Sequence, residues 1–148
     1  MTRVLVLNGP NLGSLGRREP EIYGPQSLAD IDAELRRQAA ELGVELRTEQ
    51  SNSEGRLIDI LEEEGGRAGA VIINPGGLSH TSVALLDALR GFPGAVVEVH
   101  LTNTFRREGY RHAMVTAEVA DCVILGLGPE GYRVALEAAV RIIRERQN

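Results

Sequence analysis

The chain has 148 residues, of which 43% are hydrophobic and 25% are charged, as in ordinary globular proteins, and this length predicts one domain over residues 1–148. Its net charge of −5 argues against a nucleic-acid partner, because binding through phosphate contacts requires a basic face. A single cysteine excludes a disulfide framework, and the chain shows neither a leader-like start nor a long apolar run, so we expect a cytoplasmic protein with no membrane partner.

Apolar runs typical of strands alternate along the chain with runs of helical periodicity. The predicted strands are 3–8, 44–50, 70–74, 95–101 and 122–128. The predicted helices are 27–43, 53–64, 80–91 and 128–146. Strand 44–50 alternates polar and apolar residues, which predicts a place near a sheet edge, whereas strand 70–74 is apolar until its last residue, which predicts a central place.

This alternation predicts an α/β fold with a five-stranded parallel sheet covered by helices on both faces. The order resembles a flavodoxin-like three-layer sandwich, in which ligands bind beyond the carboxyl ends of the strands at the switch point. Three polar stretches fall at such ends, namely 8–11, 74–80 and 100–103. We therefore expect the functional site to be built from these stretches.

The first strand leads into an unusually long loop, residues 7–24, which is rich in glycine and polar residues. Connections after a strand are usually about 2–6 residues long, and loops beyond about 12 residues tend to be functional or disordered. We expect residues 12–24 to form a lid. Asn11 is a candidate for an amide directed into the site, and its alternative role is that of an ordinary turn residue.

The lid also carries Arg18 and Tyr23. A tyrosine has an ordinary pKa of about 10 and serves as a base at neutral pH only where positive charge stabilises its phenolate. Tyr23 is therefore a candidate base, and the alternative is that it packs the loop down. Candidate sources of the positive charge are Arg17, Arg18, Arg106, Arg107 and Arg111.

The second stretch begins with Asn74, which leaves the central strand into a Pro-Gly-Gly turn, and His80 follows. Both are candidate ligand-binding residues, and backbone N–H groups at the start of the next helix, with Ser79 or Thr81 nearby, favour a polar or anionic ligand. The alternative for His80 is a capping or surface histidine. Asp87 lies two turns into that helix, where a solvated face is the ordinary environment.

The third stretch contains Glu98 and His100, which share one face of a strand because they are two residues apart. A histidine titrates near neutral pH, and an adjacent carboxylate favours its protonated form, so this pair is a candidate proton donor. The backbone N–H groups of Leu101 and Thr102 leave the sheet there and are candidates for binding a carboxylate. Arg107 and Arg111 are four residues apart and would point the same way on a helical turn.

Several common sites have no counterpart in the sequence. The three histidines lack metal-ligand spacing and no cysteine pair exists, so we expect no metal. No phosphate-binding loop is present, and the glycines of 126–131 follow the last strand in the wrong register for a nucleotide fingerprint. Five aromatic residues are few for a flavin site, so we expect no cofactor.

The chain resembles the type II 3-dehydroquinate dehydratases, or type II dehydroquinases, of the shikimate and quinate pathways. The blocks that carry the resemblance are, in chain order, LNGPNL, REPEIYG, QSNSEG, INPGGLSHTSVALLDAL, VEVHLTN and REGYRH. The resemblance implies a flavodoxin-like subunit in a homododecamer, a tetramer of trimers. It also implies a cofactor-free and metal-free trans-elimination of water from 3-dehydroquinate, through an enolate, to give 3-dehydroshikimate.

The resemblance assigns roles to individual residues. Tyr23 would be the proton acceptor, Arg18 would stabilise its phenolate and the transition state, and Asn11 would position a water that supports the enolate. His100, paired with Glu98, would protonate the departing hydroxyl. The substrate would be bound by Asn74, His80, Asp87, Leu101, Thr102, Arg107 and Arg111, with Asp87 acting across a subunit boundary.

The chain departs from the family pattern in the lid and in two loops. Gly13 and Ser14 replace bulkier residues, and Gly13 adds backbone freedom, so we expect a lid that is more mobile than usual. The other departures are Ser53, Phe105, Gly109, Ala113 and Met114. The Gly13, Ser14 and Phe105 departures leave open a binding or scaffold protein that has lost turnover, and a flavodoxin-like electron carrier or phosphoacceptor is a third hypothesis.

Overall fold

The computed structural model describes all residues, 1–148, and its strands form one sheet in the order β2-β1-β3-β4-β5. All four strand pairs are parallel. The order is that of the flavodoxin-like doubly wound fold, with its switch point between β1 and β3. The strands are β1 (Arg3–Asn8), β2 (Glu45–Gln50), β3 (Ala70–Asn74), β4 (Ala95–His100) and β5 (Cys122–Leu125).

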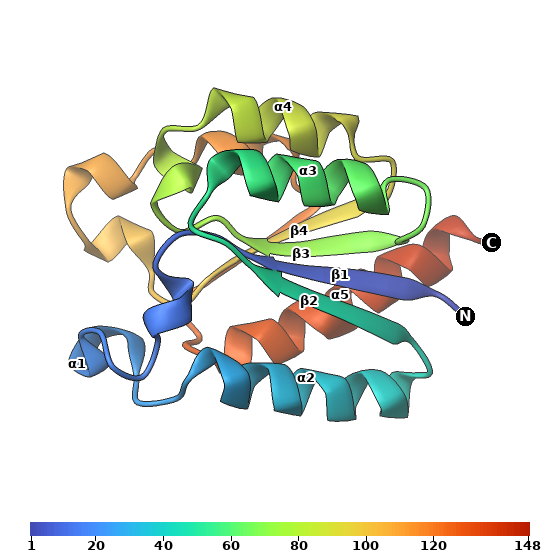
Figure 1. Ribbon diagram of the computed structural model, residues 1–148, viewed down its shortest axis with the longest axis horizontal. Helices are drawn as coiled ribbons and strands as arrows, with labels where there is room; N and C mark the ends of the chain where they lie inside the picture. The colour runs from blue at the N-terminus through green and yellow to red at the C-terminus, as the bar shows by residue number, and fades with distance from the viewer.

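Helices cover both faces of the sheet and complete a three-layer sandwich (Figure 1). α2 (Leu28–Leu42) and α5 (Glu130–Arg146) lie on one face, and α3 (Glu54–Glu64) and α4 (Val83–Gly91) lie on the other. Each face buries its own apolar cluster, because β1, β3 and β4 carry apolar side chains on both sides. The one-turn helix α1 (Pro20–Tyr23) and the irregular segments gather at the carboxyl ends of the strands (Figure 1).

Local sequence explains where α2 begins and ends. The Ser27 hydroxyl accepts a hydrogen bond from the Asp30 N–H, and the Asp30 carboxylate accepts one from the Ser27 N–H, which forms a capping box. Ile31 and Leu35 are buried on the inner face. Gly43 ends the helix with a φ of 73°, a left-handed conformation that glycine adopts without steric cost. The sequence predicted this helix, together with the edge place of β2 and the central place of β3.

Several predicted boundaries are wrong. α4 begins at Val83, because Gly76–His80 forms a 3-10 turn and the Ser82 hydroxyl caps the helix by accepting from the Leu85 N–H. The last strand ends at Leu125, where the backbone turns at a glycine. The fourth strand ends one residue early, at His100.

The last strand is also less buried than its apolar sequence suggests, because β5 is the second edge of the sheet. Val123 is 39% exposed and Cys122 is only partly buried. Partial burial, with the neighbouring Asp121 charge, raises the pKa of the Cys122 thiol, so this cysteine is mainly protonated near neutral pH.

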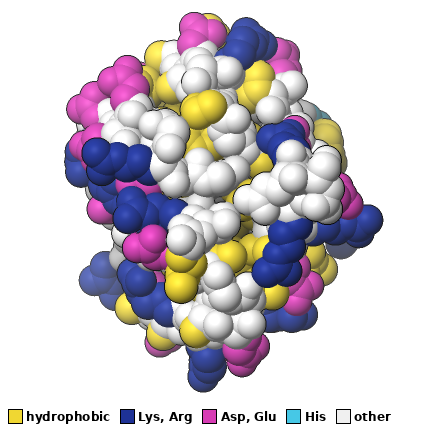
Figure 2. Space-filling model, turned by 90° about the vertical axis from the view of Figure 1, so that its right-hand side faces the viewer, with side chains coloured by type: hydrophobic (Ala, Val, Ile, Leu, Met, Phe, Trp, Pro, Cys, Tyr) yellow, Lys and Arg dark blue, Asp and Glu magenta, His cyan; other side chains and the backbone are white.

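The face at the amino ends of the strands carries charges of both signs (Figure 2). Basic and acidic side chains alternate around its margin, and its centre consists mostly of backbone and uncharged side chains. This face therefore lacks the single-sign basic surface on which phosphate-backbone binding depends. None of the helices is both long enough and apolar enough to cross a bilayer.

One buried carboxylate joins β1, β2 and α3. Glu64 is 1% exposed and accepts hydrogen bonds from Arg3 at 3.0 Å and from Arg47 at 2.8 Å. Burial raises the pKa of Glu64, but the hydrogen bonds from Arg47 and Arg3 outweigh that effect and hold the pKa below its usual value. The ion pairs of Glu64 with Arg3 and Arg47 therefore stabilise the fold only while Glu64 is ionised.

We expect Glu64→Gln to lower the free energy of unfolding by about 2 kcal/mol at pH 7, because it removes the charge that both guanidiniums share. A depressed folded-state pKa means that the contribution is complete above the unfolded pKa of about 4.3 and is lost as the pH falls through the folded value. Denaturant unfolding at pH 7 and near pH 3 measures the difference. Glu63→Gln is the matched control, since Glu63 is an exposed partner of the same Arg47 and should change stability much less. Equal losses for the two variants, or a loss that is independent of pH, would contradict this.

Candidate active site

A cavity of about 150 Å³ lies at the carboxyl ends of β1, β3 and β4, beneath the loop that follows β1. It is smaller than the roughly 300–1,000 Å³ pockets that hold drug-sized ligands, so it suits a small molecule, and most of the residues that line it are not hydrophobic. Ten of the twelve predicted site residues line it. They are Asn11, Arg18, Tyr23, Asn74, His80, His100, Leu101, Thr102, Arg107 and Arg111.

The loops after β1 and β3 form the floor of the cavity because two glycines let their backbones touch. A Cβ on Gly9 would lie 2.5 Å from the Pro75 carbonyl oxygen, and one on Gly76 would lie 2.8 Å from that of Pro10. Gly76 also has a φ of 61°. Both positions therefore require glycine, which fixes the β3 loop directly beside the β1 loop.

A buried tyrosine that the sequence did not single out orients this floor. Tyr132 on α5 is 1% exposed; its hydroxyl donates to Asn8 Oδ1 and accepts from Asn74 Nδ2 at 3.0 Å. Burial raises the pKa of the Tyr132 phenol well above its usual value, so it stays a neutral donor. The Asn74 Oδ1 in turn accepts from the Gly76 N–H at 3.1 Å. Asn74 thus presents a fixed amide at the end of the central strand.

The start of the lid is anchored in the core. Leu12 and Leu15 are buried with the α2–α5 cluster and flank Gly13 and Ser14. The Ser14 hydroxyl donates to the Asn11 carbonyl at 2.8 Å. The predicted extra mobility from Gly13 stays a prediction, and these anchors hold the residues on either side of it.

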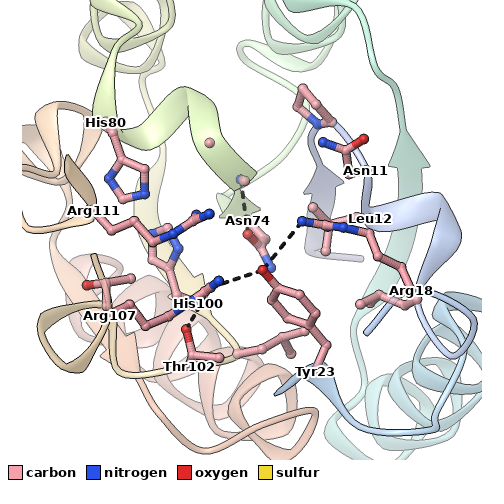
Figure 3. Close-up of a pocket in the computed structure, with 16 residues that line it drawn as sticks. Asn11, Leu12, Arg18, Tyr23, Asn74, His80, His100, Thr102, Arg107 and Arg111 are labelled. Atoms are coloured by element: carbon pink, nitrogen blue, oxygen red, sulfur yellow. Dashed lines mark hydrogen bonds between the residues drawn. The ribbon is translucent and has the colours of Figure 1, made fainter. Parts of the chain in front are cut away.

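Two arginines from different loops meet at the tyrosine hydroxyl (Figure 3). Arg107 Nη1 donates to the Tyr23 hydroxyl at 3.0 Å and Arg18 Nη2 donates at 3.4 Å. Their guanidinium carbons also lie 5.3 and 4.9 Å from the ring centroid. Two cations therefore converge on one phenolic oxygen. The predicted partnership of Arg18 with Tyr23 is present, and Arg107 makes the shorter contact.

A third cation, Arg111, lines the cavity beside these two (Figure 3). Its Nε donates to Glu108 Oε2 at 2.8 Å. Burial lowers the pKa of Arg111, but the hydrogen bond to Glu108 and the electrostatic interactions with the nearby Tyr23 and Glu108 raise it beyond its usual value. Arg111 is therefore a permanent positive charge on the cavity wall.

The two histidines of the cavity are held by different partners. His80 Nδ1 lies 2.8 Å from the Ala113 carbonyl oxygen, which can only accept, so Nδ1 carries the proton and Nε2 is the free nitrogen. His100 Nε2 lies 2.7 Å from Glu98 Oε2, which leaves Nδ1 free. The rings stack loosely, with centroids 6.3 Å apart and planes at 26°. Both rings therefore have one free nitrogen for a ligand.

Glu98 is fully buried below His100 and does not line the cavity. The predicted pairing of Glu98 with His100 is thus present, with the carboxylate shielded from solvent. Ser79, which was expected near an anion at a helix start, instead points its hydroxyl at Glu98. Thr116, from the connection between β4 and β5, also binds Glu98 and was not identified from the sequence.

The segment after His100 offers backbone donors to the cavity. The N–H groups of Leu101 and Thr102 donate to no other backbone carbonyl. The Thr102 side chain lies 3.5 Å from Arg107 Nη1. Adjacent free N–H groups beside a cation suit a carboxylate oxygen.

Asp87 is outside this cavity. It is exposed on α4, within 4.0 Å of Arg90, and lines an open groove between α3 and α4. Within one chain it therefore cannot reach a ligand of the cavity. No three histidine, cysteine, aspartate or glutamate side chains come together as metal ligands.

Comparison with known proteins shows close relatives along nearly the whole chain. Residues 2–140 match the family described as dehydroquinase class II. The chain is 54% identical over 136 residues to a 3-dehydroquinate dehydratase of Chelativorans sp., covering 91% of this chain and 94% of that protein. It is 50% identical over 145 residues to one of Halothermothrix orenii, covering 98% of each. A crystal structure of the type II dehydroquinase from Propionibacterium acnes superposes with a TM-score of 0.91 at 39% identity, covering 95% of this chain and 97% of that one.

Proposed function

The chain belongs to the class II dehydroquinase family and is a hydro-lyase that removes water from 3-dehydroquinate in the shikimate pathway, and from that premise we propose how its own residues carry out the reaction. The observation that supports the proposal most is the contact of two guanidiniums with the hydroxyl of one lid tyrosine, in the same cavity as a carboxylate-paired histidine. This gives a base and an acid in separate environments, as acid–base elimination requires.

Tyr23 is the base. As a phenolate it takes the proton from the carbon next to the ketone, and the electron pair of that bond delocalises into an enolate. Arg18 and Arg107 stabilise the phenolate before the transfer and the negative charge that moves onto the substrate during it. Asn11, on the cavity wall, holds a water against the enolate oxygen.

His100 is the acid. The enolate collapses, a carbon–carbon double bond forms, and the carbon–oxygen bond to the departing hydroxyl breaks. The hydroxyl takes a proton from His100 and leaves as water, and Glu98 holds the imidazolium in place. The product is 3-dehydroshikimate, and a trans elimination requires the base and the acid to act from opposite faces of the ring.

The remaining cavity residues bind the substrate. Its carboxylate accepts hydrogen bonds from the Leu101 and Thr102 N–H groups and from the Asn74 amide, and its ring hydroxyls bind His80 and Arg111. The reaction is measured directly as the rise in enone absorbance when the purified protein is mixed with 3-dehydroquinate. Binding of this compound without any such rise would contradict catalysis and favour a binding protein.

The assembly and the cellular location are part of this proposal. We expect a homododecamer in the cytoplasm, with Asp87 reaching the cavity of a neighbouring subunit, since it faces away from its own. Sedimentation should give a mass about twelve times the 16.0 kDa of one chain. A monomer or a trimer at micromolar concentration would refute the dodecamer and leave the chemistry of the single cavity untouched.

A further inference from the structure

The environment of Glu98 contains more than the histidine it binds. Its side chain is 0% exposed, and no arginine or lysine touches it. Its only partners are His100 and two hydroxyls, those of Ser79 and Thr116. A buried carboxylate needs its lone pairs satisfied, so these two hydroxyls supply what solvent cannot.

The two hydroxyls divide the carboxylate between them. Ser79 donates to Oε2 at 2.8 Å and Thr116 donates to Oε1 at 2.5 Å, while His100 also binds Oε2. Donors on both oxygens fix the plane of the carboxylate. His100 and Ser79 both bind Oε2, so the orientation of the carboxylate plane sets the direction from which Glu98 holds the imidazole.

The hydroxyls reach Glu98 from two separate segments. Ser79 belongs to the 3-10 turn after β3, and Thr116 belongs to the 3-10 segment Val115–Val119 between β4 and β5. Both are 0% exposed, and their oxygens are 3.2 Å apart. The serine and the threonine therefore close the buried side of the carboxylate, and the imidazole closes the side toward the cavity.

Neutral donors at these positions have a chemical consequence. An arginine there would satisfy the carboxylate and also cancel its charge. Hydroxyls hydrogen-bond to the Glu98 carboxylate without neutralising its negative charge. The attraction between Glu98 and a protonated His100 is therefore not weakened by a competing cation.

From this arrangement we propose that Ser79 and Thr116 are positioning residues for the elimination, which hold Glu98 and through it the imidazole of His100. The inference rests on the role of His100 given above. Neither hydroxyl lines the cavity, so neither touches the substrate. Their contribution therefore belongs to the proton transfer and not to substrate binding.

Thr116→Val removes the donor and keeps the shape, and Ser79→Ala removes the other. We expect each to lower kcat about tenfold, the order expected for the loss of one hydrogen bond to a charged group, with KM within about a factor of two. Thr116→Ser, which restores the donor, should recover most of kcat. A kcat near the wild-type value in both Thr116→Val and Ser79→Ala would overturn the proposal.

Ser82→Ala is the matched control for general destabilisation. Ser82 is also buried, and its hydroxyl donates to a carboxylate oxygen of Glu54 at 2.5 Å and caps α4, but it does not contact Glu98. We expect it to lower the unfolding midpoint while kcat stays within about a factor of two of the wild type. A tenfold loss of kcat in Ser82→Ala as well would mean that destabilisation alone explains the effect.

A double variant separates positioning from any independent action. In a His100→Ala background, Thr116→Val should lower kcat no further, because the group it positions is gone. A further tenfold loss would show that Thr116 acts through something else and would overturn the proposal. If His100→Ala itself kept the wild-type kcat, the proposed role of His100 would be wrong. If His100→Ala were inactive and Thr116→Val were unaffected, the role of His100 would stand and the positioning role of Thr116 would be wrong.

Discussion

Tyr23→Phe should lower kcat on the order of a thousandfold, within the range that a general base contributes. The substitution removes one oxygen and keeps the ring between Arg18 and Arg107, so the lid keeps its cation–ring contacts. Substrate affinity should change little, because the binding donors come from other segments. Steady-state kinetics and the dissociation constant of 3-dehydroquinate, measured on the same preparation, test both halves of this expectation.

Tyr110→Phe is the matched control for that change. Tyr110 is 67% exposed, and its ring also lies against an arginine, with the Arg111 guanidinium carbon 5.2 Å from its centroid. Loss of its hydroxyl should leave kcat within about a factor of two, as for surface substitutions away from a site. Equal activity of Tyr23→Phe and the wild type would remove Tyr23 as the base, whatever its contacts with the arginines.

The fold was largely predictable because its signals are local. The capping box of Ser27 and Asp30 fixes the start of α2, and the apolar run 70–73 fixes β3, so both signals come from residues that are adjacent in sequence. The start of α4 was not predictable in the same way. Ser79 is drawn toward Glu98, and His80 toward the Ala113 carbonyl, so His80 ends a 3-10 turn instead of beginning the helix.

The same distinction applies to the site. Side chains that follow the strand ends, such as Asn74 and His100, could be placed together because parallel strands end at one edge of a sheet. Tyr132 and Thr116 could not, since each acts on a partner far away in sequence and a lone tyrosine or threonine has no identifying pattern. The role of Asp87 could be expected only from the resemblance to the family, because within its own chain Asp87 lies outside the cavity.

The second large effect is expected from His100→Ala, which should lower kcat by roughly a hundredfold to a thousandfold, because the hydroxyl must then leave without a positioned acid. Tyr23, Arg18 and Arg107 remain in place, so removal of the proton next to the ketone should continue. Substrate that carries deuterium at that carbon should therefore lose its label to water faster than it loses its hydroxyl.

That exchange distinguishes the acid from the base. In Tyr23→Phe both label loss and elimination should fall together, since no enolate forms, whereas in His100→Ala the enolate forms and returns to substrate. Mass spectrometry of recovered 3-dehydroquinate, with enone absorbance followed in parallel, measures the two rates. If His100→Ala slowed label loss as much as elimination, His100 would be required for enolate formation. The division of labour between the lid tyrosine and the histidine above Glu98 would then be wrong.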